Sequence, residues 1–371
     1  MKVDLLPYLS VGQGLRDEMT ALRNHCSVYD SPFFDPDFAG VLAKVRKDVF
    51  VITVQDGAGL AGFWPMHVRP GKWARPIGAA FSDWHGPVLR EGFRDILPVS
   101  LLEKSGLKGM TAGGVQPHHM RACSGGEIMA TGLATTPDGG DAYRALMRSL
   151  HPKHFKNLRR AERLIAKDVG EMVLNIDDTS REAFDWLMST KQEQYIRTGK
   201  HNVLGPRWVQ DMMEALFTQR LPRLRGRLST LRLGGKLAAA EFDLLSDKVV
   251  HGWITAYDHA YAAYSPGHLL MLSVIADMEN TGHEVCDLGA GNHAYTKHYE
   301  SYVRPSERVI LKTSGAFRPF ASLWSAAETV LPGRAKSTMQ SIRHRGDQIF
   351  NTDLNSKDRL KGIAQALFRR R

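Results

Sequence analysis

The alternation of apolar and polar residues predicts strands in two separate regions of the chain. Residues 49–54 and 60–68 are rich in β-branched and aromatic side chains, and an Asp-Gly turn lies between them, so we predict a hairpin. Four more strands are predicted, at 227–233, 237–245, 249–257 and 308–312. Gly-Gly and Ser-Asp turns join the first three of these. The pattern indicates an α/β (α+β) fold with mixed, mainly antiparallel sheets flanked by helices.

Apolar residues recur at helical spacing in the middle of the chain. Helices are predicted at 95–105, 151–169, 181–197 and 208–219. In the second of these, Pro152 suits the first turn and Gly170 suits the end. In contrast, two prolines are expected to exclude a helix from residues 30–36.

A stretch rich in Gly, Pro, Thr and Asp at 124–140 separates the two strand-rich regions. We therefore predict an N-terminal domain at 1–140, a C-terminal domain at 141–315 and a helical tail at 316–371. The tail holds eleven Lys/Arg against four Asp/Glu, whereas the whole chain has a net charge of +10. Because the positive charge is concentrated in the tail, it does not indicate a nucleic-acid-binding protein, and no nucleic-acid partner is expected.

Several classes of function lack their sequence signals. The chain contains no Walker A sequence, Rossmann fingerprint, HExxH, GxSxG or paired-cysteine zinc pattern, so no metal is expected. Its three cysteines are scattered, which suits a reducing cytoplasm. No apolar run approaches the roughly 18 residues of a membrane span, and the N-terminus lacks a secretory pattern. A cytoplasmic location is therefore expected.

The loop that follows the strand at 249–257 is a candidate anion site. It passes from a strand into a helix, where unpaired N–H groups and the helix dipole favour a phosphate or pyrophosphate. Pro266 suits the first helical turn, and Gly267 lets a ligand approach the backbone. An ordinary capped helix is the alternative. The residues of this candidate cofactor site are Ser265, Pro266, Gly267, His268 and Leu269.

Three segments in the right order carry a resemblance to a known family. They are Phe81-Ser82-Asp83-Trp84-His85-Gly86-Pro87-Val88, the basic helix at 154–164, and a C-terminal series of Ser265-Pro266-Gly267-x-Leu269-Leu270, Glu279-x-x-Gly282, Asp287-Leu288-Gly289 and Tyr295. The chain thereby resembles GNAT-type acyltransferases. It is most similar to the cellulose-biosynthesis-associated (CelD/BcsL-like) acetyltransferases, which are relatives of the Fem aminoacyltransferases. The resemblance implies two GNAT-like domains side by side, with acetyl-CoA or another acyl-CoA as co-substrate. In the family a lysine often follows the tyrosine, whereas here Thr296 takes that place and Lys297 is shifted by one.

Acyl transfer from a thioester suggests roles for three residues. The leaving thiolate needs a proton, and Tyr295 is the first candidate to supply it, ahead of Tyr299. Period-2 alternation places Glu241 and Asp243 on one face of a strand, with Ala240 on the other, so this carboxylate pair is a candidate base. The alternatives are a core tyrosine with a structural hydrogen bond, and a structural ion pair or solvated edge for the carboxylates.

Six residues are candidates for binding the acceptor. By resemblance, the segment of Asp83 and Trp84 faces the cleft between the two halves, although a loop turn with an aromatic anchor is the alternative. The other four are His251, Trp253, Asp287 and Lys297. His251 and Trp253 alternate along one strand and are expected to line one cleft, while a purely structural role is the alternative.

The function we predict is transfer of an acyl group, first of all acetyl, from acyl-CoA to an amine or hydroxyl of a glycan precursor or polar small molecule. One alternative is a Fem-like aminoacyl-tRNA-dependent transferase, although no long helical arm is evident. The other is a GNAT-fold binding protein without catalysis. The basic helix is suited to the 3′-phosphate of CoA or to an anionic acceptor, or is a solvated face. The basic tail is suited to peripheral contact with an anionic membrane at its inner face, to a partner protein, or to docking on the domain.

Overall fold

In the computed structural model of the chain, residues 1–115, 127–290, 295–313, 345–355, 359–360 and 362 are described. Their strands form one sheet of thirteen, in the order β1-β2-β3-β4-β6-β13-β7-β12-β11-β10-β9-β8, with β5 paired to β3. The pairs are mainly antiparallel, and the parallel exceptions between strands are β4 with β6 and β11 with β12. The predicted GNAT-like α/β class, a mixed sheet flanked by helices, is confirmed.

The N-terminal half contains a six-stranded part of this sheet and three α-helices within the described residues. The elements are β1 Lys2–Pro7, α1 Gln13–Asn24, α2 Pro36–Val45, β2 Val49–Asp56, β3 Gly59–Arg69, β4 Trp73–Pro76, β5 Val88–Leu89, α3 Pro98–Lys104 and β6 Gly109–Val115. The predicted hairpin of β2 and β3 is confirmed.

The C-terminal half contains the longer helices. Its elements are β7 Glu127–Thr135, α5 Gly139–Leu150, α6 Pro152–Asp168, β8 Met172–Asn175, α7 Arg181–Arg197, α8 Arg207–Thr218, β9 Arg225–Leu233, β10 Lys236–Leu245, β11 Val249–Tyr257, α9 Pro266–Ala276, α10 Met278–Thr281, β12 Val285–Ala290 and β13 Tyr302–Lys312. The predicted meander of β9, β10 and β11 is confirmed.

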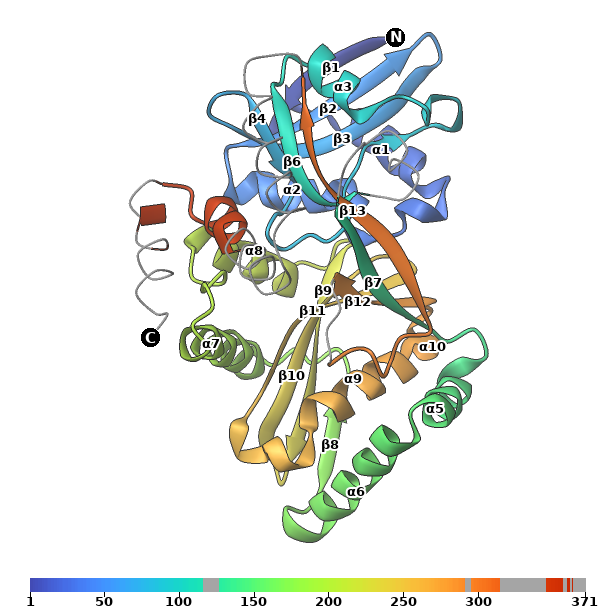
Figure 1. Cartoon of the computed structure of the whole chain (residues 1–371), viewed down its shortest axis with the longest axis vertical. Coiled ribbons are helices and arrows are strands. Elements are labelled where there is room, and N and C mark those ends of the chain that lie inside the picture. Colours follow the sequence, from blue (N-terminus) through green and yellow to red (C-terminus); the bar gives the residue numbers. More distant parts are fainter. Residues whose placement is uncertain (116–126, 291–294, 314–344, 356–358, 361, 363–371) are drawn as a thin grey trace, which may run out of the picture.

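Two long strands join the halves. Strand β13 pairs with β6 of the N-terminal half through residues 307–312, and with β7 through residues 302–308. Strand β7 in turn pairs with β12. Figure 1 shows β13 and β7 running from the N-terminal half, drawn in blue, to the C-terminal half below it. The halves are therefore parts of one continuous sheet.

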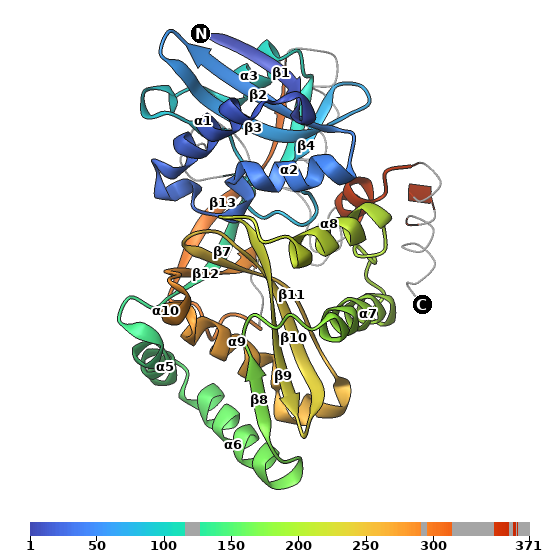
Figure 2. The same cartoon turned by 180° about the vertical axis from the view of Figure 1, so that it is seen from behind.

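Helices cover both faces of the C-terminal strands. Helices α7 and α8 pack on one face of β9–β11, and α9 packs on the other together with α5 and α6 (Figure 2). The apolar core on the α7–α8 face continues into the N-terminal half, where α2 contacts α8. The α9 face has a separate core. As predicted from period 2, Ala240 belongs to the first core, while Ala239 belongs to the second.

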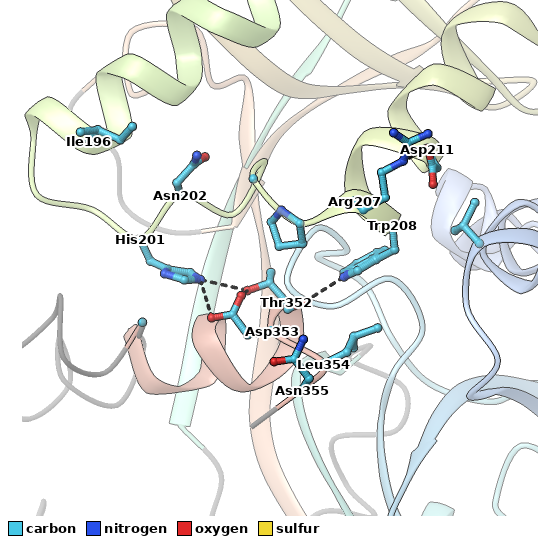
Figure 3. A pocket seen from close by; sticks show the side chains of 14 residues that line it. Ile196, His201, Asn202, Arg207, Trp208, Asp211, Thr352, Asp353, Leu354 and Asn355 are labelled. Atoms are coloured by element: carbon cyan, nitrogen blue, oxygen red, sulfur yellow. Dashed lines mark hydrogen bonds and ion pairs between the residues drawn. The ribbon is translucent and has the colours of Figure 1, made fainter. Parts of the chain in front are cut away.

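A helical segment at 345–352, close to the C-terminus, packs between the two halves. Figure 3 shows it beneath the connection between α7 and α8, where His201 Nε2 lies 3.1 Å from Thr352 Oγ1 and Trp208 Nε1 donates to the Thr352 carbonyl at 2.9 Å. On its other side the segment contacts the N-terminal half, because Arg75 lies 3.3 Å from Asp347. Residues 316–344 of the predicted helical tail lie outside the described residues.

Two local predictions need correction, and one strand was not predicted. Residues 30–36 are not free of helix, because a 3₁₀ turn spans Pro32–Phe34 and Pro36 begins α2. Pro36 occupies the first helical position, which needs no N–H, and Asp35 caps it through the N–H of Asp37. Residues 127–135 of the predicted boundary stretch form β7, a central strand. The Gly-rich β6 was not predicted, because its glycines serve close packing rather than a strand pattern.

Candidate functional site

The parallel strands β11 and β12 separate and form a fork. They pair over only three positions, from Val249 opposite Val285 to His251 opposite Asp287, although β11 continues to Tyr257. Beyond His251 no pairing between them is formed in the described residues, so the sheet opens on the side of the C-terminal ends. An opening between two parallel strands exposes backbone groups and side chains to a ligand at their carboxyl ends.

The N-terminus of α9 lies at the open end of this fork. Ser265 has a left-handed backbone, with φ 52° and ψ 47°, and its carbonyl accepts from the N–H groups of His268 and Leu269. Pro266 has no N–H, and the Gly267 N–H makes no hydrogen bond within the described part of the chain. A strained serine at a helix start is a feature of ligand-binding turns. The five residues predicted as the cofactor site thus form one helix start at the fork.

The Tyr295 hydroxyl lies over this helix start. A Cβ atom added to Gly267 would be 2.9 Å from Tyr295 Oη, so the glycine is what allows the phenol to approach. The hydroxyl is buried and has no hydrogen-bond partner in the described residues. Burial, followed by the nearby Glu241 carboxyl, raises the pKa of Tyr295 well above its usual value. The phenol therefore keeps its proton at neutral pH, as a proton donor must.

Tyr299 has a different environment, which matches the structural alternative. Its hydroxyl lies 3.0 Å from His154 Nε2 and 3.0 Å from His268 Nδ1, and the residue is fully buried. His298 stacks on His154, with ring centroids 4.3 Å apart, so several histidines surround this phenol beside the start of α9. Burial lowers the pKa of His154 and of His268 to about 4, which leaves both neutral at pH 7.

The predicted carboxylate pair lies behind the fork. Asp243 Oδ2 lies 2.9 Å from Arg227 Nη2, and both side chains are 0% exposed. Glu241 is also buried, and burial together with the Asp243 charge raises its pKa well above the usual value. The geometry of Asp243 is that of the structural ion pair, which was the alternative to a base. Burial and the neighbouring Asp243 charge therefore both favour the protonated form of the Glu241 carboxyl.

A second set of acidic residues lies at the fork itself. His251 Nε2 is 3.5 Å from Asp83 Oδ2, and its Nδ1 is 3.5 Å from Asp287 Oδ1. Trp84 Nε1 donates to Asp287 Oδ2, and the Ala290 N–H donates to Asp83 at 3.1 Å. Burial lowers the pKa of His251, but the charges of Asp287 and Asp83 outweigh it, so the net direction is upward. Four of the predicted acceptor residues are thus brought into one Asp–His–Asp arrangement.

The Asp83 loop is held against β6 by a glycine. A Cβ added to Gly114 would lie 1.7 Å from the Asp83 carbonyl oxygen, and Gly114 has φ 69°. No side chain fits at such a distance, so only glycine allows this contact. Asp83 keeps 30% of its side chain exposed, whereas His251 and Asp287 are buried. The exposed carboxylate therefore faces the space between the halves, supported by the buried pair.

The remaining predicted residues lie apart from this arrangement. Trp253 packs between Phe33, Phe81 and Phe242 and donates to the Phe81 carbonyl at 2.6 Å, so it joins the two halves through the core. Lys297 is exposed.

Sequence reasoning missed several residues of the site. They are Arg227, Gly114, and the two arginines Arg75 and Arg308, which line a cavity beside Asp83. The Gly-Gly pair before Val115 was the available signal for a close backbone approach.

Two absences apply to the described part of the chain. No group of three or more His, Cys, Asp or Glu residues there is arranged to hold a metal ion. None of its helices has the length and apolar character required to cross a membrane.

Comparison with known proteins finds a family match that includes the start of α9 and Tyr295. Residues 152–297, from α6 to just beyond Tyr295, match the family model of the acetyltransferase (GNAT) domain. The chain therefore contains a GNAT-type acetyltransferase domain, and it is an acyltransferase by class. No curated protein matches the chain.

Solved structures share the fold over most of the chain. One is FemX, with a TM-score of 0.55 at 9% identity, covering 84% of this chain and 98% of that one. Another is the C-terminal domain (DUF2156) of a protein described as a lysylphosphatidylglycerol synthetase from Agrobacterium fabrum. It has a TM-score of 0.51 at 15% identity and covers 84% of this chain and 95% of that one. At these identities the likeness concerns the fold alone.

Proposed function

We propose that the chain transfers an acyl group, first of all acetyl, from acyl-CoA to an amine or hydroxyl acceptor. The pyrophosphate of CoA binds at the start of α9, and the pantetheine arm runs into the fork between β11 and β12. The observation that carries the proposal is the Tyr295 hydroxyl, which is buried, protonated and without a partner in the described residues, directly over Gly267.

The residues have distinct roles in this proposal. The acceptor attacks the thioester carbonyl from the side of Asp83, whose carboxylate takes the proton that the acceptor loses. His251, flanked by Asp287, positions Asp83. As the C–S bond breaks, Tyr295 donates its proton to the departing thiolate. Glu241 lies near Tyr295 with its pKa raised by burial, and the Arg227–Asp243 pair stabilises the strands behind it.

The basic face of α6 extends the cofactor site in this proposal. His154, near the start of α6, lies beside His268 of α9, with ring centroids 5.0 Å apart. Lys153 and Lys156 occupy the same first turns of α6 and are exposed. Cations near a helix N-terminus reinforce a phosphate site, so these lysines are suited to the 3′-phosphate of CoA.

A melting-temperature series tests the cofactor. Acetyl-CoA, longer acyl-CoAs and free CoA are added in turn to the intact protein, and we expect each to raise the melting temperature through binding to the folded state. The variant Tyr295→Phe should bind acetyl-CoA normally but release free CoA at least about 10²-fold more slowly, the usual contribution of a positioned acid. If neither free CoA nor any of the acyl-CoAs binds, the proposal is excluded.

The finer assignment follows the resemblance to cellulose-biosynthesis-associated (CelD/BcsL-like) acetyltransferases. On that basis we propose an acceptor from polysaccharide-precursor or related polar metabolism, and a cytoplasmic protein whose basic tail contacts the inner membrane face or a partner protein. A Fem-like, aminoacyl-tRNA-dependent transferase is the second candidate, because the chain shares its fold with FemX. Transfer from aminoacyl-tRNA without acyl-CoA would favour that second candidate.

A further inference from the structure

A cavity of about 160 Å³ lies next to Asp83, between the two halves. Its wall is formed by the Asp83 loop, by β4, β6, β7 and β13, and by the end of β12. The C-terminal helical segment contributes Asp347, Gln348 and Asn351. At about 30 Å³ per water molecule this volume holds roughly five waters, which is the size of a small polar group and not of a whole sugar chain. The cavity therefore suits one end of an acceptor whose reacting atom is close to Asp83.

The charges around this cavity have opposite signs at different places. Asp83 contributes a carboxylate, and Arg75 and Arg308 contribute two guanidinium groups from β4 and β13. Arg75 is paired with Asp347, whereas Arg308 forms no ion pair within the described part of the chain. Arg308 is half-buried, and its Nε lies 3.8 Å from the position of a Cβ on Gly113. A partly desolvated arginine without a counter-ion is a strong site for a carboxylate or phosphate.

We propose that the acceptor is a small primary amine that also carries an anionic group, either a carboxylate or a phosphate. The anionic group binds Arg308, with Arg75 beside it, and the amine lies at Asp83 facing the fork. This inference rests on the proposed acyltransferase function and adds the acceptor class.

The charge pattern fits the reaction that would take place there. An amine at neutral pH is an ammonium ion, which Asp83 attracts and deprotonates so that nitrogen can attack the thioester carbon. The new C–N bond forms as the C–S bond breaks, and Tyr295 protonates the thiolate. The two protons that the ammonium loses leave one after the other through Asp83 to solvent, and one proton taken up from solvent restores the Tyr295 phenol, so each turnover releases one proton. The products are CoA and the N-acylated acceptor, which keeps its carboxylate or phosphate, and the reaction requires no oxidant or metal. Loss of the ammonium charge leaves the product with only its contact to Arg308, which weakens its hold on the site.

Matched pairs of acceptors test the proposal. Phosphoethanolamine is compared with ethanolamine, and β-alanine with propylamine, so that each pair differs in the anionic group. The rate of transfer from acetyl-CoA is measured from the release of the free thiol of CoA. We expect the charged member of at least one pair to have a kcat/KM at least about tenfold higher, which is the effect of one charge-assisted hydrogen bond. The pair that shows the larger preference distinguishes phosphate from carboxylate. Equal use of charged and neutral members would overturn the proposal.

Variants locate the anion site. Arg308→Gln should raise KM for the charged acceptor about tenfold and leave KM for the neutral one unchanged, whereas Arg308→Lys should recover part of the loss. The control Arg148→Gln changes an exposed arginine of α5 and should change neither value. Asp347→Asn frees Arg75 and should lower KM for the charged acceptor. An equal effect of Arg308→Gln on both members of a pair would overturn the assignment.

A binding measurement separates this inference from the proposed function. Phosphoethanolamine and β-alanine are each added to the CoA-saturated protein, and we expect at least one to raise the melting temperature in the wild type and not in Arg308→Gln. If acyl-CoA binds and neither anionic amine binds or reacts, the acceptor class is wrong and the transferase assignment stands. If no acyl-CoA binds but an anionic amine still binds through Arg308, the anion site stands and the transferase assignment is wrong.

Discussion

The contact between Gly267 and Tyr295 gives a quantitative prediction about the proposed active site. In Gly267→Ala the new Cβ would lie 2.9 Å from the Tyr295 hydroxyl, closer than side-chain carbons approach an oxygen in folded proteins. Overpacking of this kind costs about 1–3 kcal/mol. An alanine in a helix instead of a glycine gains about 1 kcal/mol. We therefore expect Gly267→Ala to lower the free energy of unfolding by about 0–2 kcal/mol.

Removing the Tyr295 hydroxyl should reverse the sign of the effect of Gly267→Ala on the free energy of unfolding. In the Tyr295→Phe background the nearest atoms to the new Cβ are the former Cζ at 3.8 Å and Tyr257 Cδ1 at 3.9 Å, which are ordinary contacts. Gly267→Ala should then stabilise the protein by up to about 1 kcal/mol. Tyr295→Phe alone should not destabilise it, because the buried hydroxyl has no hydrogen-bond partner in the described residues to lose. The coupling between the two sites is therefore about 1–3 kcal/mol.

Urea unfolding of the four proteins in this double-mutant cycle measures the coupling. Thiol release from acetyl-CoA, measured on the same proteins, should show a lower kcat for Gly267→Ala, since the phenol must move away from the helix start. If Gly267→Ala changes the unfolding free energy equally with tyrosine and with phenylalanine at 295, the hydroxyl does not lie over Gly267, and the role given to it is wrong.

Three further predictions concern buried charge. Asp243→Asn should lower the free energy of unfolding by about 3–5 kcal/mol, because it leaves Arg227 buried without its counter-ion, and an Arg227→Met/Asp243→Leu double variant should restore most of it in urea titrations. The loss of unfolding free energy in Asp243→Asn should lie near the lower end of this range, about 3 kcal/mol, because Glu241 can ionise in place of Asp243. If Asp243→Asn instead has normal stability and no turnover, Asp243 is catalytic. Glu241→Gln should leave stability and kcat at pH 7 nearly unchanged, because burial and the Asp243 charge favour the protonated carboxyl, and a large drop in kcat would show that it acts as a carboxylate. The folded protein holds His154 and His268 with pKa values of about 4 against 6.5 when unfolded, so the unfolded state binds more protons and stability must fall as pH falls from 6.5 to 4. A His154→Gln/His268→Gln variant should flatten this dependence in denaturation at a series of pH values, and an unchanged slope would contradict it.

Local sequence signals were sufficient for the elements that carry the cofactor site. The turns at Gly234-Gly235 and Ser246-Asp247 predicted β9, β10 and β11 to within a few residues, and Pro266 marked the start of α9. These features depend on neighbouring residues only. The central strand β7 was not predicted, because its position depends on pairing with β12 and β13, which lie 150 or more residues further along the chain.

The pairing of Asp243 shows where local reasoning ends. Counting from the Gly234-Gly235 turn places Gly226 opposite Asp243, because Leu233 faces Lys236. A bulge between Leu237 and Ala239 shifts the register by one residue and brings Arg227 opposite instead. A structural ion pair was one alternative for Asp243, but counting along the strands could not identify Arg227 as its partner. The Asp83–His251–Asp287 arrangement was likewise beyond a local prediction, since its members come from three distant segments.

The antiparallel pairing of β13 with β6 has a consequence for biosynthesis. The ribosome must finish residue 312 before β6 is fully paired with its antiparallel neighbour, so the first half of a nascent chain waits with an open backbone edge until just over five-sixths of the 371 residues exist. A gene cut near codon 140 would leave that edge permanently bare. The two protein fragments encoded by such a divided gene are expected to aggregate when produced separately and to form the native sheet only when produced together.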